Sequence, residues 1–182
     1  FSHKKDTIKN GDTGDIACDH FHLWPKDLEL LENLGVNSYR FSISWPRILP
    51  SGKESKPNQA GLDFYSRLID NLLEKNITPF ITLNHWDIPQ SLEDEGGWTK
   101  RMMVDAFVNY SYHTSKHLGD RVTHWITHNE PWCVSYIGYV AGHKPPGLKN
   151  NWPKSLAAAH HLLLSHGMAI PEIRNNTKDA QV

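Results

Sequence analysis

Short runs of β-branched and aromatic residues alternate along the chain with longer segments whose apolar residues recur at helical spacing. The short runs are typical of strands and lie at 36–43, 78–83 and 124–129. The longer segments have apolar residues three or four positions apart, which predicts helices, and lie at 62–75, 100–118 and 155–174. Strands that alternate with helices imply a parallel sheet with right-handed crossovers, so we expect an α/β chain with one domain segment over 1–182.

Prolines and glycines mark the expected boundaries of these elements. Pro25 suits the first turn of one further helix, which Gly35 would end. Pro171 lies inside the last helical pattern and is expected to kink or end that helix. The tail 179–182 falls where another strand would begin. The segments rich in Gly, Pro and polar residues are expected to be loops, at 1–20, 50–61, 88–99 and 133–153.

Each predicted strand ends in a cluster of polar and aromatic residues. The third strand runs into Asn129 and Glu130, and Pro131 stops it because proline lacks an N–H and disfavours helix at the residue before it. Long polar segments follow the strands, whereas the turns after the helices are short. In a parallel sheet the carboxyl ends of the strands meet at one edge, so we expect the functional site there.

Composition removes several classes of function. The 182 residues include 19 basic and 20 acidic ones, so no charge excess suggests a nucleic-acid partner. No apolar run approaches the ~18 residues of a membrane span, and no signal peptide is visible, so a cytoplasmic location is expected. Seven Trp and six Tyr suit either sugar platforms or a core. Cys18 and Cys133 have no metal-like spacing and are expected to be reduced thiols.

The residues at the strand ends favour carbohydrate chemistry. The chain has no Gly-rich phosphate loop, no nucleophile elbow and no HExxH zinc motif. A carboxylate beside amides, a histidine, an arginine and indoles suits a sugar, whose hydroxyls need hydrogen bonds and whose C–H faces need an apolar wall. Cleavage of a glycoside needs two carboxylates, one of which must keep its proton near neutral pH.

Three motifs carry a resemblance to a known family. RFSISWPRI at 40–48, TLNHWDIP at 82–89 and NEPW at 129–132 resemble glycoside hydrolase family 1, the β-glucosidase family. The resemblance runs without a visible gap over 1–182. It implies the (β/α)8 TIM barrel, of which this chain would hold about strands 2–4 with their flanking helices. It also implies retaining hydrolysis of β-glycosides without a cofactor or metal.

The resemblance assigns roles to individual residues. It makes Glu130 the acid/base that protonates the leaving group and later deprotonates water. Asn129 would hydrogen-bond the 2-hydroxyl of the sugar and His85 the 3-hydroxyl, while Trp86 would line the same pocket. The β-glycoside is the expected small-molecule partner.

The resemblance also places part of the machinery outside this chain. A full barrel needs about 250 residues. The family's nucleophile, in a Glu-Asn-Gly motif on the seventh strand, has no counterpart here. We therefore expect this chain alone to be inactive and to need the remainder of the barrel, from the same protein or another chain. The alternative is a non-catalytic member that binds sugars or a protein partner.

Several residues have a structural interpretation beside the functional one. Arg40 matches an arginine near the nucleophile, or it belongs to a structural ion-pair network. His85 could simply pack at a strand end, and Trp132 is expected in the pocket wall or just behind it. Trp45 and Trp98 are expected to be core or loop anchors rather than sugar platforms.

Other polar residues are not expected to take part directly. Asp87 as the second carboxylate is disfavoured because it follows a different strand from the family's nucleophile. His128 stands where the family usually has an apolar residue, and we expect it to affect the electrostatics around Glu130 in a direction the sequence leaves open. The helical histidines are expected to be solvated or packed rather than metal ligands, at His113, His117, His160, His161 and His166.

Overall fold

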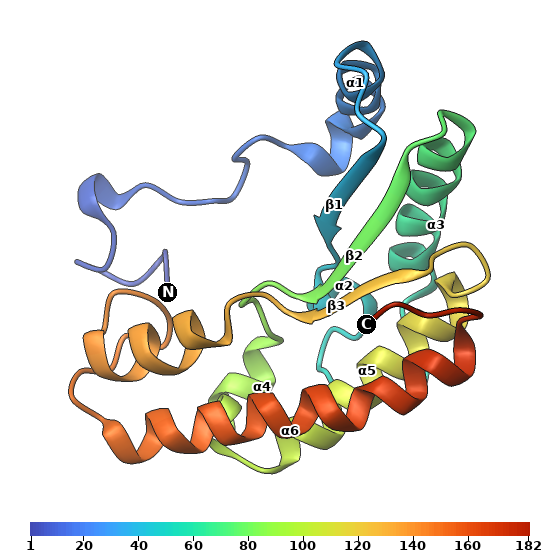
Figure 1. Cartoon of the computed structure of the whole chain (residues 1–182). Helices are drawn as coiled ribbons and strands as arrows, with labels where there is room; N and C mark the ends of the chain where they lie inside the picture. The colour runs from blue at the N-terminus through green and yellow to red at the C-terminus, as the bar shows by residue number, and fades with distance from the viewer.

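The computed structural model describes all 182 residues, and its centre is a three-stranded parallel sheet in the order β1-β2-β3 (Figure 1). The three predicted strands are confirmed, as β1 (Ser38–Ser42), β2 (Thr78–Asn84) and β3 (His124–His128). The pairing register places Phe41 beside Ile81 and Ile81 beside Trp125. These three apolar residues therefore share one face of the sheet, and all three are buried.

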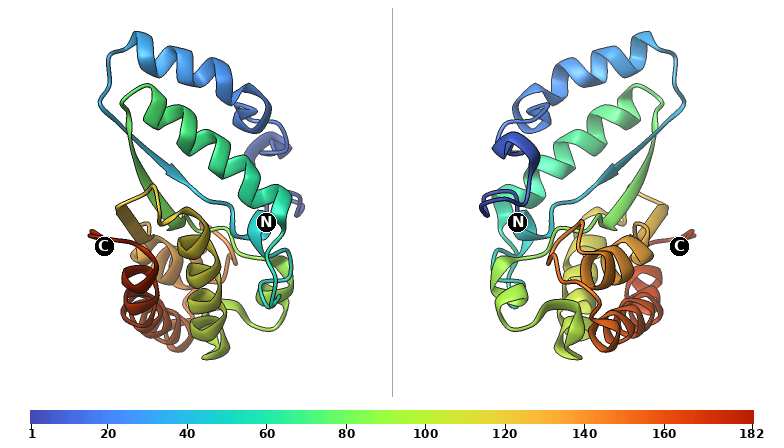
Figure 2. Two further views of the ribbon diagram at one scale, coloured as in Figure 1. Left: turned by 90° about the vertical axis from the view of Figure 1, so that its right-hand side faces the viewer. Right: turned by 90° about the vertical axis from the view of Figure 1, so that its left-hand side faces the viewer.

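Helices connect the strands. They are α1 (His20–Asn33), α2 (Trp45–Ile48), α3 (Gln59–Glu74), α4 (Gln90–Asp94), α5 (Met102–Leu118) and α6 (Trp152–Asn176). The 3₁₀ segments η1 (Lys9–Gly11) and η2 (Gly97–Thr99) and the π-helix η3 (Cys133–Ala141) complete the elements. Helix α3 lies beside α1 and helix α5 lies beside α6 (Figure 2). Because α3 and α5 each join two neighbouring strands, the predicted β–α–β order is confirmed.

The helix layer is fixed to the strand ends by an aromatic cluster. The ring of Trp45 stacks on Tyr110 of α5, with 4.9 Å between centroids, and Trp98 and Phe107 pack around them. The Tyr110 hydroxyl donates to the main-chain oxygen of Leu83 at 2.9 Å and is also 3.2 Å from that of Ile43. One buried phenol thereby ties the ends of β1 and β2 to α5.

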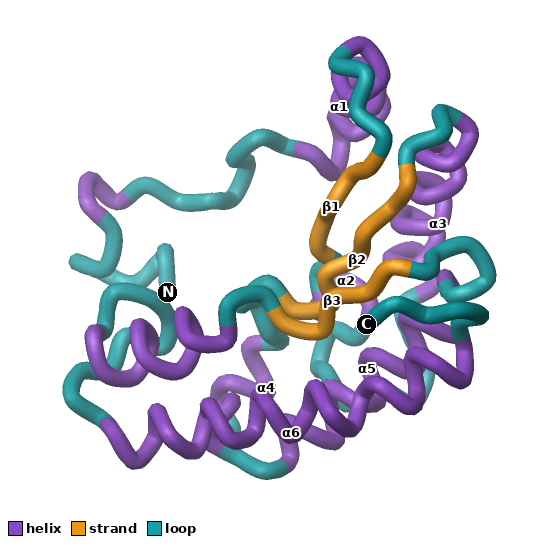
Figure 3. The backbone as a smooth tube through the Cα atoms, in the orientation of Figure 1, coloured by secondary structure: helices purple, strands orange, loops and turns teal.

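The connections have the predicted asymmetry. The chain runs from Ser42 to Gln59 and from Asn84 to Met102 after the first two strands, and these long segments contain only short helical turns (Figure 3). After α3 and α5 the next strand follows within a short turn. The long segments lie on the side of the sheet where the strands end, which is where a site can be built from several of them.

The start of helix α1 was predicted wrongly. The helix begins at His20, so Pro25 lies inside it and not in its first turn. The carbonyl of Asp19 accepts hydrogen bonds from the N–H groups of His22 (3.0 Å) and Leu23 (2.9 Å), which starts the helix earlier. Pro25 removes one donor in the second turn, a loss that a helix of 14 residues tolerates.

The region expected to be a loop after β3 contains the π-helix η3, so the prediction for 133–141 was wrong. Gly138 does not break this helix. Its missing side chain leaves room for the carbonyl of Pro145, which lies 2.5 Å from where a Cβ would be. Gly142, at φ +74, ends the helix instead. Close packing, rather than backbone freedom, explains the first of these glycines.

Helix α6 continues through Pro171 to Asn176, so the predicted helix is confirmed and only the alternative that Pro171 ends it is wrong. Pro171 and Gly167, four residues before it, are both exposed. Water can therefore hydrogen-bond the carbonyl that loses its helical donor, which lowers the cost of the proline. Helix α3 begins three residues before the predicted segment, and α4 and η2 occupy part of the predicted loop 88–99.

The expected strand at the C-terminal tail is present as a first bridge. Gln181 pairs with His124 in parallel. The N–H of Trp125 donates to the carbonyl of Gln181, and the N–H of Gln181 donates to that of Thr123, both at 2.8 Å. The tail therefore forms one isolated bridge with β3, where a further strand was expected. None of the helices combines the length and the apolarity needed to span a bilayer.

Candidate active site

The side chain of Asn129 is the meeting point of the three strands at their carboxyl ends. Nη2 of Arg40, from β1, donates to Asn129 Oδ1 at 2.6 Å. The indole Nε1 of Trp86, after β2, donates to the main-chain oxygen of Asn129 at 3.0 Å. Nδ2 of Asn129 lies 3.2 Å from Nε2 of His85. Four residues singled out from the sequence are thus brought together by direct contacts.

These contacts fix how the Asn129 amide is turned. Because Arg40 has only donors, the atom facing it must be the carbonyl oxygen, which leaves the NH2 group to face His85. His85 Nε2 is then the acceptor in this contact. Arg40 is itself held by a second bond, from Nε to Thr82 Oγ1 at 2.9 Å. The amide NH2 and the His85 ring therefore lie side by side, as groups that could share a sugar's vicinal hydroxyls.

The backbone at this edge adopts rare conformations. Trp86 has φ +81 and Glu130 has φ +41, in the left-handed region that residues with a Cβ seldom occupy. Just before these two residues, the N–H of Asn129 donates to the carbonyl of Asn84 at 2.9 Å, which extends the β2–β3 ladder by one hydrogen bond. Such strain persists only where the surroundings hold it, and it gathers at functional sites.

The carboxylate of Glu130 projects from this edge and is exposed. Its side-chain hydrogen bond comes from Cys133, whose Sγ lies 3.2 Å from Oε2. The sequence predicted only that Cys133 is a reduced thiol, and it forms no disulfide. Its hydrogen bond to Glu130 was not predicted. The spacing of three residues across Pro131 was the available signal, because a turn there brings the two side chains together.

Comparison with known proteins agrees with this geometry. The family model described as glycosyl hydrolase family 1 matches residues 1–182. The chain belongs to glycosyl hydrolase family 1. A 1,4-beta-D-glucan glucohydrolase from Thermotoga neapolitana is 51% identical over 182 residues, and Beta-glucosidase A from Thermotoga maritima is 50% identical. The solved structure of a beta-glucosidase from Thermotoga maritima in complex with glucoimidazole superposes with a TM-score of 0.96 at 50% identity.

The family members are much longer than this chain. All of the chain is covered in these comparisons, but only 42%, 40% and 41% of the respective relatives. The chain thus spans about two fifths of their length. Its three parallel strands and flanking helices form part of a (β/α)8 barrel, as expected from the sequence, and the apolar face shared by Phe41, Ile81 and Trp125 lies toward the helices.

Tryptophans divide into two groups in this family 1 chain. Trp45 and Trp98 are buried, with 0% and 2% exposure, which confirms them as anchors. Trp132 is 60% exposed and stacks on Tyr136, with 4.8 Å between ring centroids, so the structure does not bring it against Asn129. Its expected place in the pocket wall stays a prediction.

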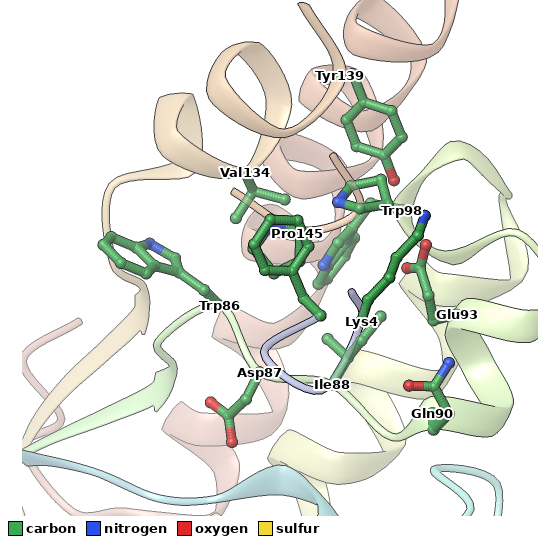
Figure 4. A pocket seen from close by; sticks show the side chains of 12 residues that line it. Lys4, Trp86, Asp87, Ile88, Gln90, Glu93, Trp98, Val134, Tyr139 and Pro145 are labelled. Carbon is green, nitrogen blue, oxygen red and sulfur yellow. The ribbon is translucent and has the colours of Figure 1, made fainter. Parts of the chain in front are cut away.

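Trp86 lines a cavity of about 380 Å³ (Figure 4). The other wall of this cavity includes Val134 and Tyr139 of η3 together with Trp98. The ammonium group of Lys144 lies over the Trp86 ring, 3.9 Å from its centroid. One face of this indole is therefore occupied by a cation, which is an attractive arrangement for an aromatic ring.

His128 does not supply charge to the site. Burial, and secondly His166, lower its pKa to about 3, so it is neutral. Its ring stacks on Phe107, with 4.3 Å between centroids, and Nε2 lies 2.9 Å from Ser165 Oγ. It belongs to the packing between β3 and the helices, which answers the question that the sequence left open about Glu130.

The remaining polar candidates lie apart from Asn129. Burial raises the pKa of Asp87, against the opposing effects of Ser44 and Arg47, and its carboxylate points away from Tyr139 in Figure 4. No group of three or more His, Cys, Asp or Glu side chains is arranged to hold a metal ion. Of the helical histidines, His161 Nδ1 is 2.9 Å from the carbonyl of Trp98 and His166 Nδ1 is 2.8 Å from Thr127 Oγ1.

Proposed function

We propose that this chain supplies the acid/base half of a retaining β-glycosidase site. Glu130 is the acid/base, Asn129 and His85 bind sugar hydroxyls, and Trp86 forms a wall of the sugar pocket. Arg40 orients Asn129. The observation that carries the proposal is the network centred on Asn129, which fixes the residue next to a strand-end carboxylate with contacts from two neighbouring strands.

The proposed reaction needs a second carboxylate from the part of the barrel that this chain does not include. In retaining hydrolysis the two carboxyl groups lie about 5–5.5 Å apart. The Glu130 carboxyl gives its proton to the glycosidic oxygen while the nucleophile forms a bond to the anomeric carbon and the leaving group departs. Glu130, now ionised, takes a proton from water as that water attacks the same carbon and releases the enzyme.

The proposed substrates are β-glucosides. The relatives are named as a glucan glucohydrolase and a β-glucosidase, and the solved relative was bound to glucoimidazole and, in another structure, to a galacto-hydroximolactam. The exposed edge with amide, imidazole and indole groups suits such a sugar. The alternative is a sugar-binding or partner-binding member without catalysis, and it predicts that loss of the Glu130 carboxylate leaves binding intact and removes no turnover.

The test uses the complete barrel, meaning residues 1–182 together with the strands that complete it, from the native polypeptide or from the Thermotoga maritima relative. Glu130→Ala and Glu130→Gln are assayed on two substrates. An alkyl β-glucoside needs a proton for its leaving group, and its hydrolysis is expected to fall about 10²–10⁴-fold. With a dinitrophenyl β-glucoside the leaving group departs as the stable dinitrophenolate anion and needs no proton, so formation of the glycosyl–enzyme is expected to stay near the parent rate.

Azide sharpens the test, because it attacks the glycosyl–enzyme without a general base. Added azide is expected to restore turnover of the dinitrophenyl substrate by Glu130→Ala and to give the β-glucosyl azide. Glu74→Gln, the same chemical change in an exposed residue at the end of α3, is the matched control and is expected to change neither rate. Equal losses on both substrates, with no rescue by azide, would contradict the acid/base role.

The isolated chain offers a second test. The 182 residues alone are expected to hydrolyse no aryl β-glucoside, because the nucleophile is absent. Turnover by this chain that disappears in Glu130→Gln would contradict the need for a carboxylate from elsewhere in the barrel.

A further inference from the structure

Cys133 is the side-chain hydrogen-bond partner that the structure gives to Glu130. The thiol Sγ lies 3.2 Å from Oε2, and the N–H of Cys133 donates to the main-chain oxygen of Glu130 at 2.8 Å. The two residues are thus joined through both main chain and side chain, across the turn that contains Pro131. Cys133 is the first residue of η3, and the positive φ of Glu130 directs the chain into this turn.

We propose that the Cys133 thiol positions the Glu130 carboxyl group and holds it in the orientation from which it exchanges its proton. This proposal rests on the proposed acid/base role of Glu130. Cys133 itself is a positioning residue, because it acts through Glu130 and not on the sugar.

The chemistry of a thiol suits this task. An acid/base group must carry a proton in one step and lack it in the next, so its partner must not favour the ionised form strongly. A hydroxyl donor to a carboxylate makes a short, strong, charge-assisted bond that lowers the carboxyl pKa. A thiol is a weaker donor. It can hold the carboxyl group in place with less bias toward its ionised form.

Glu130 in turn affects the protonation of the Cys133 thiol. Burial first, and then the hydrogen bond and negative charge of Glu130, raise the pKa of Cys133, while Lys144 opposes them. A raised pKa keeps the thiol protonated near neutral pH and therefore able to donate. It also makes the thiol less reactive toward alkylating reagents, because the thiolate is the nucleophile.

A simpler account is that Cys133 only fills space at the start of η3, as a small apolar residue would. The two accounts differ in what they predict. A space-filling residue affects all substrates alike and is indifferent to the charge of Glu130. A positioning residue affects the steps in which Glu130 moves a proton.

The first experiment measures coupling without measuring activity. The rate at which iodoacetamide labels Cys133 in the complete barrel is followed by peptide mass spectrometry, in the parent and in Glu130→Gln. Removing the negative charge is expected to speed labelling about threefold or more at fixed pH, since half a pKa unit changes the thiolate fraction about threefold. Cys18, which is exposed, is the internal reference and should keep its rate. An unchanged Cys133 rate would overturn the proposal.

The second experiment separates positioning from packing. Cys133→Val keeps an apolar side chain of similar size without the donor, and Cys133→Ser keeps a donor and strengthens it. For Cys133→Val, hydrolysis of the alkyl glucoside is expected to fall about three- to tenfold, with formation of the dinitrophenyl glycosyl–enzyme changed less than twofold. For Cys133→Ser, the basic limb of the pH profile of kcat/KM is expected to move down by about half a unit.

The two proposals fail separately. Equal losses on both substrates in Cys133→Val, or an unmoved basic limb in Cys133→Ser, would overturn the positioning role while Glu130 remains the acid/base. If labelling of Cys133 responds to Glu130→Gln but that variant still hydrolyses the alkyl glucoside at the parent rate, the acid/base role is wrong. In that case the positioning role falls with it, and only the contact between thiol and carboxylate remains.

Discussion

The two ends of the strands are held by different interactions. At the carboxyl edge, Trp86 and Glu130 have positive φ angles, and polar side chains converge on Asn129. At the amino edge the turns are short, and Arg121 Nη1 donates to Asp70 at 2.6 Å and to Ser66 at 2.8 Å. The carboxyl edge therefore differs from the amino edge in its polar network around Asn129, whereas an ion pair and short turns hold the amino edge.

This difference predicts which substitutions affect activity and which affect stability. Polar side chains at the carboxyl edge face one another and solvent, so their loss should spare the fold and reduce turnover. Side chains in the helix layer and at the amino edge hold elements together, so their loss should lower stability and leave the kinetics of folded molecules unchanged. The following predictions, from the largest expected effect to the smallest, test that division in the complete barrel.

Of the substitutions that compare the two edges, Asn129→Ala is expected to have the largest effect. It removes the group held by Arg40 and His85 and proposed to bind the sugar. Loss of one preorganised hydrogen-bonding group at a reacting centre costs about 10²–10³-fold in rate, so kcat/KM for an aryl β-glucoside should fall by that factor. Asn37→Ala, at the exposed amino edge, is the matched control and should change it less than twofold. Similar losses in both variants would break the comparison.

His128 makes stability depend on pH. Its folded-state pKa of about 3 lies below the unfolded value of ~6.5, so the unfolded state binds the extra proton as the pH falls. Stability is therefore lost on going from pH 7 to pH 5, by roughly 2 kcal/mol from this group alone. Nδ1 of His128 is buried without a partner, so the added proton would have no acceptor.

His128→Phe should remove that part of the pH dependence. Phenylalanine can keep the stack on Phe107, and Ser165 keeps its own bond to the carbonyl of Leu162 at 2.8 Å. Urea unfolding at pH 7 and pH 5 is compared within each variant, so that a constant packing change cancels. An equal drop between the two pH values in parent and variant would show that His128 is not the group responsible.

The parts of this chain that depend on local pattern were predictable from sequence. The three strands, the helices α3 and α5 and the parallel order follow from periodicities that the packing does not override. The motifs predicted that Arg40, His85 and Asn129 meet at one edge, and these three residues are in contact there, because strand order alone dictates which ends meet. Trp45 and Trp98 were correctly expected to be anchors.

The errors at element boundaries share one feature, which is a proline or glycine that its local surroundings accommodate inside a helix. Pro25 and Pro171 lie inside helices whose other bonds tolerate one lost donor. Gly138 lies inside η3 because the Pro145 carbonyl approaches it. The side-chain partners of Asn129 could not be derived either, since hydrogen bonds between residues of different strands depend on side-chain geometry that no spacing rule contains.

Tyr110→Phe tests the layer between the two edges. The variant loses the hydroxyl that donates to Leu83 and contacts Ile43, in a fully buried position. We expect the free energy of unfolding to fall by about 1–3 kcal/mol, because buried carbonyls lose a donor. The kcat/KM of folded molecules should stay within twofold. Tyr112→Phe, on the same helix but partly exposed, should cost no more than about 0.5 kcal/mol. A loss of activity larger than the loss of folded protein would assign Tyr110 to the site instead.

Arg121 is expected to give the smallest effect, and it tests the amino edge directly. The side chain of Arg121 is 24% exposed and that of its partner Asp70 is 47% exposed. Solvent screens a pair of this kind, so Arg121→Met should lower stability by only about 1 kcal/mol. A double-mutant cycle with Asp70→Asn isolates the pair, and its coupling energy should shrink as salt is raised from 0.05 to about 1 M. Turnover by the folded enzyme should not change, because neither residue reaches the edge where Asn129 lies. A coupling that resists salt, or a fall in kcat, would mean that the two edges are not independent.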